Sequence, residues 1–231
     1  MDVSLCLSSG FLAFARHAGF LMAVEERAVR VNAITGTSSG SVVAALWASG
    51  MPAAEITALF TGRSLMSMGR PNLRLWQGLM TMAGFMDFIR PHLRGTVADL
   101  EIALAVGVVD RSGAHDLITA GPLAEVVAAS CAMPGLFAPV TVNGRPLQDG
   151  GAADRLGLGA HRAWRPGERV LAHWVERTAG KDVDAGVDGV TVVRTPRSRA
   201  RFWNLGDVPA QAREALELSR AAFDQAGLPR R

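Results

Sequence analysis

The residues of this chain that could do chemistry begin with a serine between two glycines. Gly36, Ser38 and Gly40 form the pattern Gly-x-Ser-x-Gly, after the apolar run 31–35 and before a helix-like stretch at 41–47. A serine on so sharp a turn needs small neighbours, and the turn exposes its hydroxyl above the sheet. The N-terminus of the following helix directs positive partial charge at the oxyanion that forms when the hydroxyl attacks a carbonyl. The pattern therefore predicts a nucleophile elbow with Ser38 as nucleophile.

An aspartate before two glycines offers a partner for the serine proton. Asp149, Gly150 and Gly151 follow a hairpin signal at 143–144, so the carboxylate lies on a loop that can bend sharply. A carboxylate within hydrogen-bond reach of Ser38 can take its proton directly, without a histidine. We therefore expect Asp149 to be the general base.

A histidine-dependent mechanism is the alternative. His161 and His173 follow Asp149, which gives the order serine, aspartate, histidine found in α/β-hydrolases. Neither histidine lies in a recognisable loop motif, and Ser38 comes earlier than that fold usually places its nucleophile. The alternative is a Ser-His-Asp carboxylesterase, which a histidine-to-alanine change would inactivate. We expect His17 to be a structural hydrogen-bonding residue near the start of its helix.

Alternating strands and helices must position these residues. Apolar runs predict strands at 3–8, 31–35, 101–109, 138–142, 145–147, 170–175 and 190–194. Amphipathic stretches and start signals predict helices at 16–26, 39–50, 52–59, 121–131 and 208–226. Strand and helix alternating at this spacing indicate an α/β protein in which helices cover a parallel sheet.

Length and composition restrict the class of protein. The 231 residues are 49% hydrophobic and carry a net charge of +3, which suits one large α/β domain. No run reaches about 18 apolar residues, so we expect no transmembrane helix. The start lacks the basic segment of a signal peptide, and we therefore expect a cytoplasmic protein. No zinc spacing, phosphate loop or nucleic-acid motif is present, so we expect no metal, no cofactor and no nucleic-acid partner.

Two segments raise the hypothesis of peripheral contact with a membrane surface. Residues 64–90 are rich in methionine and aromatic residues, whose flexibility suits variable acyl chains, although a plain core helix is the other interpretation. The run 194–201 holds four arginines, which favour an anionic lipid surface if they do not simply form a solvated loop. The sequence leaves the oligomeric state open.

Four segments, in order, resemble the patatin-like phospholipase family. Residues 7–21 are similar to the family's glycine-rich oxyanion loop and the helix after it, and 36–40 to its Gly-Thr-Ser-Ala-Gly. Residues 129–140 are similar to its Ala-Ser-x-Ala-x-Pro-x-x-Phe-x-Pro segment, and 149–151 to its Asp-Gly-Gly. The resemblance covers about residues 3–155, whereas residues 160–231 carry no motif that we can assign.

The resemblance implies a three-layer α/β/α patatin-like fold with a mainly parallel central sheet, formed as a single domain by residues 1–231. It implies a lipid acyl hydrolase, a phospholipase A or esterase that needs no metal for the ester chemistry. Ser38 would attack the ester of an acyl lipid or phospholipid to form an acyl-enzyme, with Asp149 as base and then as acid toward the departing alcohol. The supporting residues implied are Gly36 and Gly40 in the elbow, Gly150 and Gly151 in the base loop, and Gly10, Phe11 and Leu12 in the oxyanion hole.

The first of these segments departs from the family pattern. The usual Gly-Gly-Gly-x-Arg/Lys-Gly is here Ser-Gly-Phe-Leu-Ala-Phe at 9–14, so aromatic bulk replaces glycine and the basic residue is absent. Backbone N–H donors survive side-chain changes, and aromatic side chains suit an apolar acyl substrate. The same changes motivate a third hypothesis, a non-catalytic lipid-binding or regulatory protein on a patatin scaffold. The chain is short for the family, so we expect lid segments to be missing and the site to face a membrane.

Overall fold

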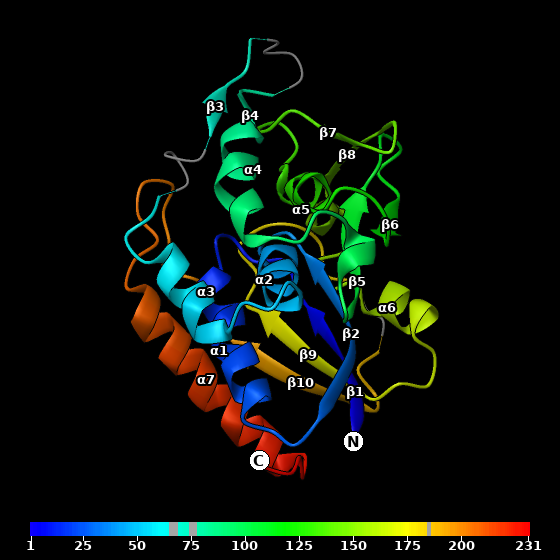
Figure 1. Cartoon of the computed structure of the whole chain (residues 1–231), viewed down its shortest axis with the longest axis vertical. Coiled ribbons are helices and arrows are strands. Elements are labelled where there is room, and N and C mark those ends of the chain that lie inside the picture. Colours follow the sequence, from blue (N-terminus) through cyan, green and yellow to red (C-terminus); the bar gives the residue numbers. More distant parts are fainter. Residues whose placement is uncertain (65–68, 74–77, 184–185) are drawn as a thin grey trace.

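A mainly parallel sheet forms the centre of the molecule in the computed structural model, which describes residues 1–64, 69–73, 78–183 and 186–231 (Figure 1). The strand order is β10-β9-β1-β2-β5-β8-β7, and β6 also pairs with β5. The parallel strands are β1 (Asp2–Leu7), β2 (Arg30–Thr37), β5 (Ala103–Val109), β9 (Val170–Val175) and β10 (Val190–Thr195). The antiparallel strands are β6 (His115–Ile118), β7 (Val140–Val142) and β8 (Arg145–Asp149).

Helices flank this sheet. They are α1 (Phe14–Glu25), α2 (Ser39–Ala48), α3 (Ala53–Phe60), α4 (Ala83–Ile89), α5 (Leu123–Cys131), α6 (Leu158–Trp164) and α7 (Val208–Gln225). A separate antiparallel pair, β3 (Arg70–Pro71) and β4 (Met80–Thr81), precedes α4. None of the helices in the described part of the chain is both long and apolar enough to cross a bilayer.

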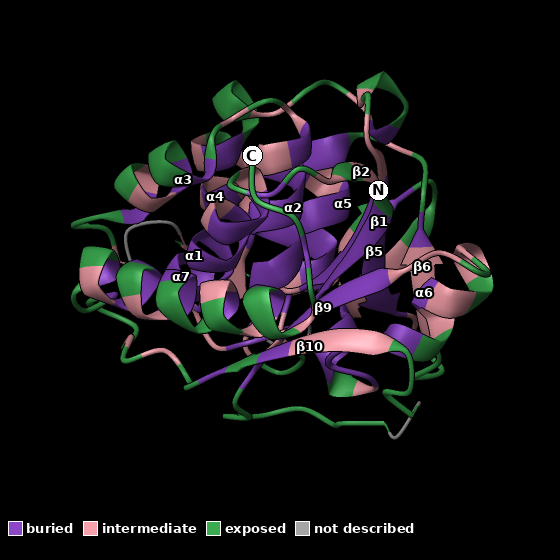
Figure 2. Ribbon diagram, turned by 90° about the horizontal axis from the view of Figure 1, so that it is seen from below, coloured by how far each residue is buried: buried purple, intermediate pink, exposed green. Residues whose placement is uncertain are grey.

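The two faces of the sheet carry different cores because side chains alternate along each strand. Leu5 and Leu7 of β1 lie in the large apolar core that α1, α2, α5 and α7 share. Cys6 lies on the other face, in a smaller cluster with Leu156 beside α6. The central strands of the sheet, which lie between these two clusters, are largely buried, whereas the edge strand β10 is only partly covered (Figure 2). Helices on both faces of a mainly parallel sheet confirm the predicted α/β fold.

A buried histidine fixes α6 to the second face of the sheet. His161 Nε2 lies 2.9 Å from Ser4 Oγ, and its Nδ1 lies 2.8 Å from Thr35 Oγ1. Burial lowers the pKa of His161 to about 4, so the ring is neutral at pH 7. Both ring nitrogens are therefore occupied by hydroxyl groups of β1 and β2, which gives this histidine a structural role.

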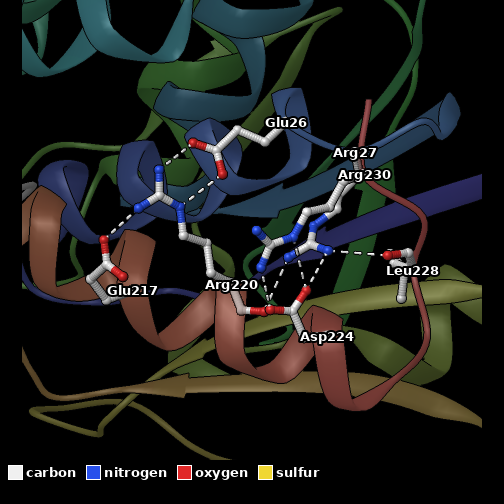
Figure 3. A network of polar contacts seen from close by, with 7 residues as sticks. All are labelled: Glu26, Arg27, Glu217, Arg220, Asp224, Leu228 and Arg230. Carbon is white, nitrogen blue, oxygen red and sulfur yellow. Dashed lines mark hydrogen bonds and ion pairs between the residues drawn. The ribbon is translucent and has the colours of Figure 1, made fainter.

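Polar contacts fasten α7 and the residues after it to the end of α1 (Figure 3). Arg27 is 1% exposed, and it donates to Asp224 at 2.7 Å and to the Leu228 carbonyl at 3.1 Å. Arg220 donates from Nε to Glu26 Oε2 at 2.8 Å. A buried guanidinium without acceptors would destabilise the fold, so these contacts hold α7 against α1. Helix α1 in turn begins directly after the loop at residues 9–13.

The predicted strands and helices at 3–8, 31–35, 170–175 and 208–226 are confirmed, with boundaries that differ by at most two residues. The predicted hairpin is also confirmed, with φ of 49° at Asn143 and 77° at Gly144. Its strands β7 and β8 join the central sheet in antiparallel orientation, next to β5.

The methionine-rich segment is only partly described. Its residues Met66, Met68 and Trp76 lie outside the described residues. Met82 and Phe85, at the start of α4, are each 3% exposed, so this part of the segment belongs to the apolar core.

Candidate active site

The predicted elbow joins β2 to α2. Ser38 is the only residue between the two elements, and it is half-buried with φ of 53° and ψ of −123°. This conformation is strained for a residue with a side chain, and a serine nucleophile on a strand-to-helix turn adopts it so that its hydroxyl projects from the sheet. The N-terminus of α2 lies directly behind the hydroxyl, where its dipole favours negative charge.

The two flanking glycines are required by the close approach of backbone. A Cβ on Gly36 would lie 2.6 Å from the Gly40 carbonyl oxygen, and a Cβ on Gly40 would lie 2.6 Å from the carbonyl oxygens of Leu7 and Ser8. Such distances exclude any side chain. The glycines therefore let the elbow fold tightly against the end of β1 and the loop that follows it.

Three serine hydroxyls hold the elbow in place. Ser130 of α5 accepts from the Ser38 N–H at 2.8 Å and donates to the Gly107 carbonyl at 2.6 Å. Ser39 donates to the carbonyl of Gly10 at 2.7 Å, which ties the elbow to the predicted oxyanion loop. Ser41 Oγ donates to the Ser38 carbonyl at 2.7 Å. The strained serine is thus fixed from α5, from the loop after β1 and from its own helix.

Asp149 lies at the end of β8 and is 5% exposed. Its Oδ1 accepts from the Gly151 N–H at 2.8 Å, which orients the carboxylate. Burial raises the pKa of Asp149 to about 6, against the opposing effects of the Ser38 hydroxyl and the Gly151 N–H. The two predicted residues are therefore close enough to interact. A carboxylate with this pKa is charged at pH 7 and still basic enough to accept a proton.

The base loop depends on its two glycines as the elbow does. A Cβ on Gly150 would lie 2.5 Å from backbone carbon of Gly107 in β5, and a Cβ on Gly151 would lie 2.5 Å from Ser9 Oγ. The loop therefore packs between β5 and the start of the oxyanion loop. This packing brings Asp149 from the hairpin to Ser38.

Ser38 and Asp149 share one cleft of about 250 Å³. Its other lining residues are Ser9, Gly10, Phe11, Met133, Pro134, Gly151, Ala152, Ala179 and Gly180. The structure thus brings together four of the segments singled out in the sequence: the oxyanion loop, the elbow, the segment at 129–140 and the base loop.

A second, smaller cavity of about 40 Å³ lies on another side of Ser38. It is lined by Phe11, Leu12, Phe14, Ser39, Met82, Phe85, Cys131, Met133 and Phe137. Burial raises the pKa of the Cys131 thiol well above its ordinary value, so the thiol is neutral. This cavity is an apolar pocket without a charged side chain.

The predicted oxyanion loop lies between β1 and α1. Gly10 and Phe11 line the cleft, whereas Leu12, with φ of 49°, lines the apolar pocket. The Phe11 ring packs edge-on against Phe202 at a centroid distance of 5.1 Å, and the Phe14 ring stacks on Phe60. The aromatic side chains that replace glycine in this loop are therefore accommodated by neighbouring rings.

An arginine that the sequence did not single out supports this loop. Arg155 is 1% exposed and donates to the carbonyls of Ser9 at 2.9 Å and Val175 at 2.6 Å. Both of these bonds come from Nη2, whereas Nη1 pairs with Asp182 at 2.7 Å. The segment around Gly180 also packs on the base loop, where Lys181 N–H donates to the Gly151 carbonyl at 3.1 Å. Residues after the recognised motifs thus complete the cleft, and no motif signalled them.

The other histidines considered in the sequence are not partners of Ser38. His173 Nδ1 lies 2.8 Å from His17 Nδ1, and its Nε2 lies 3.0 Å from Thr195 Oγ1. Burial lowers the pKa of His17 to about 3 and that of His173 well below its ordinary value. Both rings are neutral and buried between α1 and the sheet, as expected for His17. In the described part of the chain, no three His, Cys, Asp or Glu side chains gather as metal ligands would.

Comparison with known proteins places this geometry in a family. A family model for patatin-like phospholipases matches residues 5–160. Uncharacterized NTE family proteins of Mycobacterium bovis and Mycobacterium tuberculosis are 31% identical over 159 residues, which make up 67% of this chain and 44% of each relative. The chain therefore spans less than half the length of these curated relatives.

Solved structures support the fold. VipD from Legionella pneumophila matches with a TM-score of 0.56 and 14% identity, over 96% of this chain and 67% of that chain. ExoU from Pseudomonas aeruginosa, solved in complex with SpcU, matches with a TM-score of 0.51 and 15% identity, over 96% of this chain and 52% of that chain. The family model covers well over half of the sequence and includes the elbow and the base loop, and the chain therefore belongs to the patatin-like phospholipase family.

Proposed function

We propose that this chain is a lipid acyl hydrolase that cleaves carboxylic esters through a Ser38–Asp149 dyad. The observation that carries the proposal is the meeting of a strained, half-buried serine and a buried carboxylate of raised pKa in one cleft. Residues 1–231 act as a single domain in this proposal, because β9, β10 and the segment at 179–180 complete the sheet and the cleft.

The reaction proceeds in two steps, acylation of Ser38 and hydrolysis of the acyl-enzyme. Ser38 Oγ attacks the ester carbonyl while Asp149 takes its proton, so an oxygen–carbon bond forms and a tetrahedral oxyanion results. The carbon–oxygen bond to the alcohol then breaks, and Asp149 returns the proton to the departing alcohol. Water next attacks the acyl-enzyme, gives a proton to Asp149 and releases the carboxylic acid. Asp149 then returns that proton to Ser38 Oγ, which restores the enzyme.

The oxyanion is stabilised by backbone groups. We assign this role to the N–H groups of Gly10, Phe11 and Leu12, helped by the N-terminus of α2. Ser39 supports the assignment because it holds the Gly10 carbonyl and so fixes the loop relative to the nucleophile. The packing of Phe11 against Phe202 leaves the loop backbone beside the cleft. This arrangement favours a catalytic protein over a purely lipid-binding one.

The Ser-His-Asp mechanism receives less support. A triad needs a histidine between Ser38 and its aspartate, but the ring nitrogens of His161 contact Ser4 and Thr35, and those of His173 contact His17 and Thr195. Fluorophosphonate labelling of His161→Ala and His173→Ala separates the two mechanisms. Folded variants keep their labelling if the dyad operates, and lose it if either histidine is the base.

The test of the proposal uses p-nitrophenyl butanoate and a fluorophosphonate probe. We expect the unaltered chain to hydrolyse the ester and to be labelled, and Ser38→Ala to lose both. Ser219→Ala is the matched control, because the Ser219 hydroxyl also donates to a carbonyl of its own helix but lies in α7 and lines neither cavity. A well-folded chain with neither turnover nor labelling would contradict the proposal and favour the lipid-binding hypothesis.

We further propose peripheral contact with an anionic membrane at the mouth of the cleft. Trp203 is 67% exposed and Phe202 is 37% exposed, and Phe202 touches Phe11 of the cleft. The arginines before them are all exposed: Arg194, Arg197, Arg199 and Arg201. Exposed aromatic rings beside several cations suit the interface of an anionic bilayer. We include in this proposal a cytoplasmic location with reversible membrane contact.

Sedimentation with phosphatidylglycerol-containing vesicles measures this contact. Changing Arg197, Arg199 and Arg201 together to glutamine should lower the affinity about 100-fold, since each arginine near such a surface contributes about 1 kcal/mol. The matched control changes three exposed arginines elsewhere, Arg30, Arg111 and Arg213, by the same charge. Equal losses in both triple variants would show that only net charge matters and would contradict the assigned surface.

A further inference from the structure

Two cavities of different character meet at the nucleophile. The cleft and the apolar pocket have Phe11, Ser38 and Met133 in common, so both open onto the reacting atom. Their volumes are about 250 Å³ and about 40 Å³. An ester also has two arms that extend from its carbonyl carbon, the acyl chain and the alcohol. Each arm therefore has one cavity available to it.

The position of the base decides which arm goes where. Asp149 and Gly151 line the cleft and do not line the apolar pocket. A base that takes the serine proton and then protonates the departing alcohol must lie beside the alcohol oxygen. The alcohol therefore occupies the cleft, and the acyl chain is left with the apolar pocket.

The walls of the apolar pocket are fixed by packing. Phe14 is 4% exposed and stacks on Phe60, with ring centroids 4.2 Å apart. Phe137 is 2% exposed, and its neighbour Ala138 donates to the Met80 carbonyl at 2.9 Å. The segment of β4 and α4 is thereby tied to the segment at 129–140. Buried aromatic rings held in this way do not move aside easily for a longer chain.

The volume of the pocket limits what it holds. By the same measure the pocket has less than a fifth of the volume of the cleft, about 40 Å³ against about 250 Å³, so it accommodates the shorter of the two arms of the ester. Helix α4 contributes two of the buried lining residues, Met82 at its N-cap and Phe85 in its first turn. Both are 3% exposed, and neither carries a charge.

We infer that the apolar pocket is the acyl-chain site and that Met82 and Phe85, which line it, restrict it to short acyl chains. The inference rests on the proposed function, because it assigns the two arms of the ester from the side on which Asp149 lies. The substrate class is an ester of a short-chain acid with a larger alcohol, which the cleft of about 250 Å³ accommodates.

The kinetic test is kcat/KM for p-nitrophenyl esters of acetate, butanoate, octanoate and dodecanoate. Up to butanoate we expect a rise of about threefold to fourfold for each buried methylene. From butanoate to octanoate we expect a fall of about tenfold or more, because the added carbons find no space. Met82→Ala removes part of the wall and should raise the octanoate-to-butanoate ratio about tenfold. Phe85→Leu enlarges the pocket by a smaller change and should move the ratio in the same direction.

Met86→Ala is the matched control for Met82→Ala. Met86 lies one turn further along α4 and packs against the core without lining the pocket. Its ratio should equal that of the unaltered chain. A kcat/KM that keeps rising through dodecanoate, or a ratio that Met82→Ala and Phe85→Leu both leave unchanged, would overturn the inference while the dyad remained supported.

A binding measurement tests the acyl-chain site independently of turnover. In Ser38→Ala labelled with ¹³C-methyl methionine, sodium butanoate should shift the methyl signals of Met82 and Met133 and leave that of Met86 in place. Octanoate at the same concentration should produce smaller shifts. If these shifts are present but the unaltered chain neither hydrolyses the esters nor is labelled by the fluorophosphonate, the dyad is rejected and the pocket is retained. Shifts absent with both acids would reject the pocket.

Discussion

The two cavities at Ser38 are built from different kinds of residue. The cleft is formed mostly by loops, and its key members are glycines, a serine and an aspartate at fixed spacing. The apolar pocket is formed by ordinary core side chains of α1, α4, α5 and the segment at 129–140. Chemistry needs particular residues on strained or tightly packed backbone, and such residues leave a pattern in the sequence. Selectivity for the acyl chain needs only volume, and many apolar residues can supply it.

The largest effect expected from this division concerns Asp149→Asn. Removing the base should lower kcat about 10²–10⁴-fold, and by the same factor for acetate and butanoate esters, because the change lies in the cleft. Asp154→Asn is the control, since Asp154 accepts from the Leu156 and Gly157 N–H groups and an asparagine oxygen can do the same. A loss of kcat below tenfold for Asp149→Asn, or a loss that depends on the length of the acyl chain, would contradict the assignment of the chemistry to the cleft and of chain-length selectivity to the pocket.

Substitutions in the two cavities should also change the free energy of unfolding in opposite directions. The folded-state pKa of Asp149 is raised from 3.8 to about 6, so the folded state binds this proton more tightly than the unfolded chain does. The buried carboxylate therefore destabilises the fold above pH 6, and this cost disappears as the pH falls below about 4. At pH 7.5 we expect Asp149→Asn to raise the free energy of unfolding by about 1–3 kcal/mol.

The contrasting variant in the pocket is Met82→Ala. It removes a buried side chain from the core, and we expect it to lower the free energy of unfolding by about 2–5 kcal/mol. Urea denaturation of both variants at pH 7.5 and pH 4 measures the contrast. An Asp149→Asn protein that is less stable than the unaltered chain at pH 7.5 would show that its carboxylate supports the fold.

The pH dependence of acylation should be set by Asp149 in the cleft and not by the apolar pocket. Because Asp149 must be ionised to take the serine proton, kcat/KM should rise about tenfold per pH unit up to about pH 6 and then level off. The inflection should be the same for acetate and butanoate esters, since the apolar pocket contains no titrating group near this pH. Stopped-flow rates of p-nitrophenol release give both profiles. An inflection that moves with chain length would contradict the separation of the two cavities.

The sequence was most informative where backbone geometry restricts residue type. Gly36 and Gly40 were predicted from the elbow pattern, and their missing Cβ atoms are what allow contacts of 2.6 Å. Asp149 was predicted from its two glycines, which pack against Gly107 and Ser9. Strands β1 and β9 were readable because short apolar runs between polar turns have few other interpretations.

Other features depend on contacts between distant residues and left no local pattern. Ser130 lies inside a recognised motif, but its bond to the Ser38 N–H joins residues 92 positions apart. Arg155 meets Ser9 across 146 positions and lies outside the four recognised motifs. The order of serine, aspartate and histidine along the chain is compatible with a catalytic triad. Only the folded structure shows that His161 and His173 contact residues other than Ser38. Strand β6 was missed because its His-Asp start lacks the apolar run that marks the other strands.

The most direct test of the account is the structure of the chain after Ser38 has reacted with ethyl p-nitrophenyl n-propylphosphonate. Ser38 Oγ displaces p-nitrophenolate from phosphorus, and the adduct mimics the tetrahedral intermediate of a butanoate ester, with a propyl arm in place of the acyl chain and an ethoxy arm in place of the alcohol. We predict that the propyl arm lies in the apolar pocket against Met82 and Phe85, and that the ethoxy oxygen lies beside Asp149. A propyl arm found in the cleft beside Gly151 and Gly180, or an adduct on any residue other than Ser38, would contradict the account.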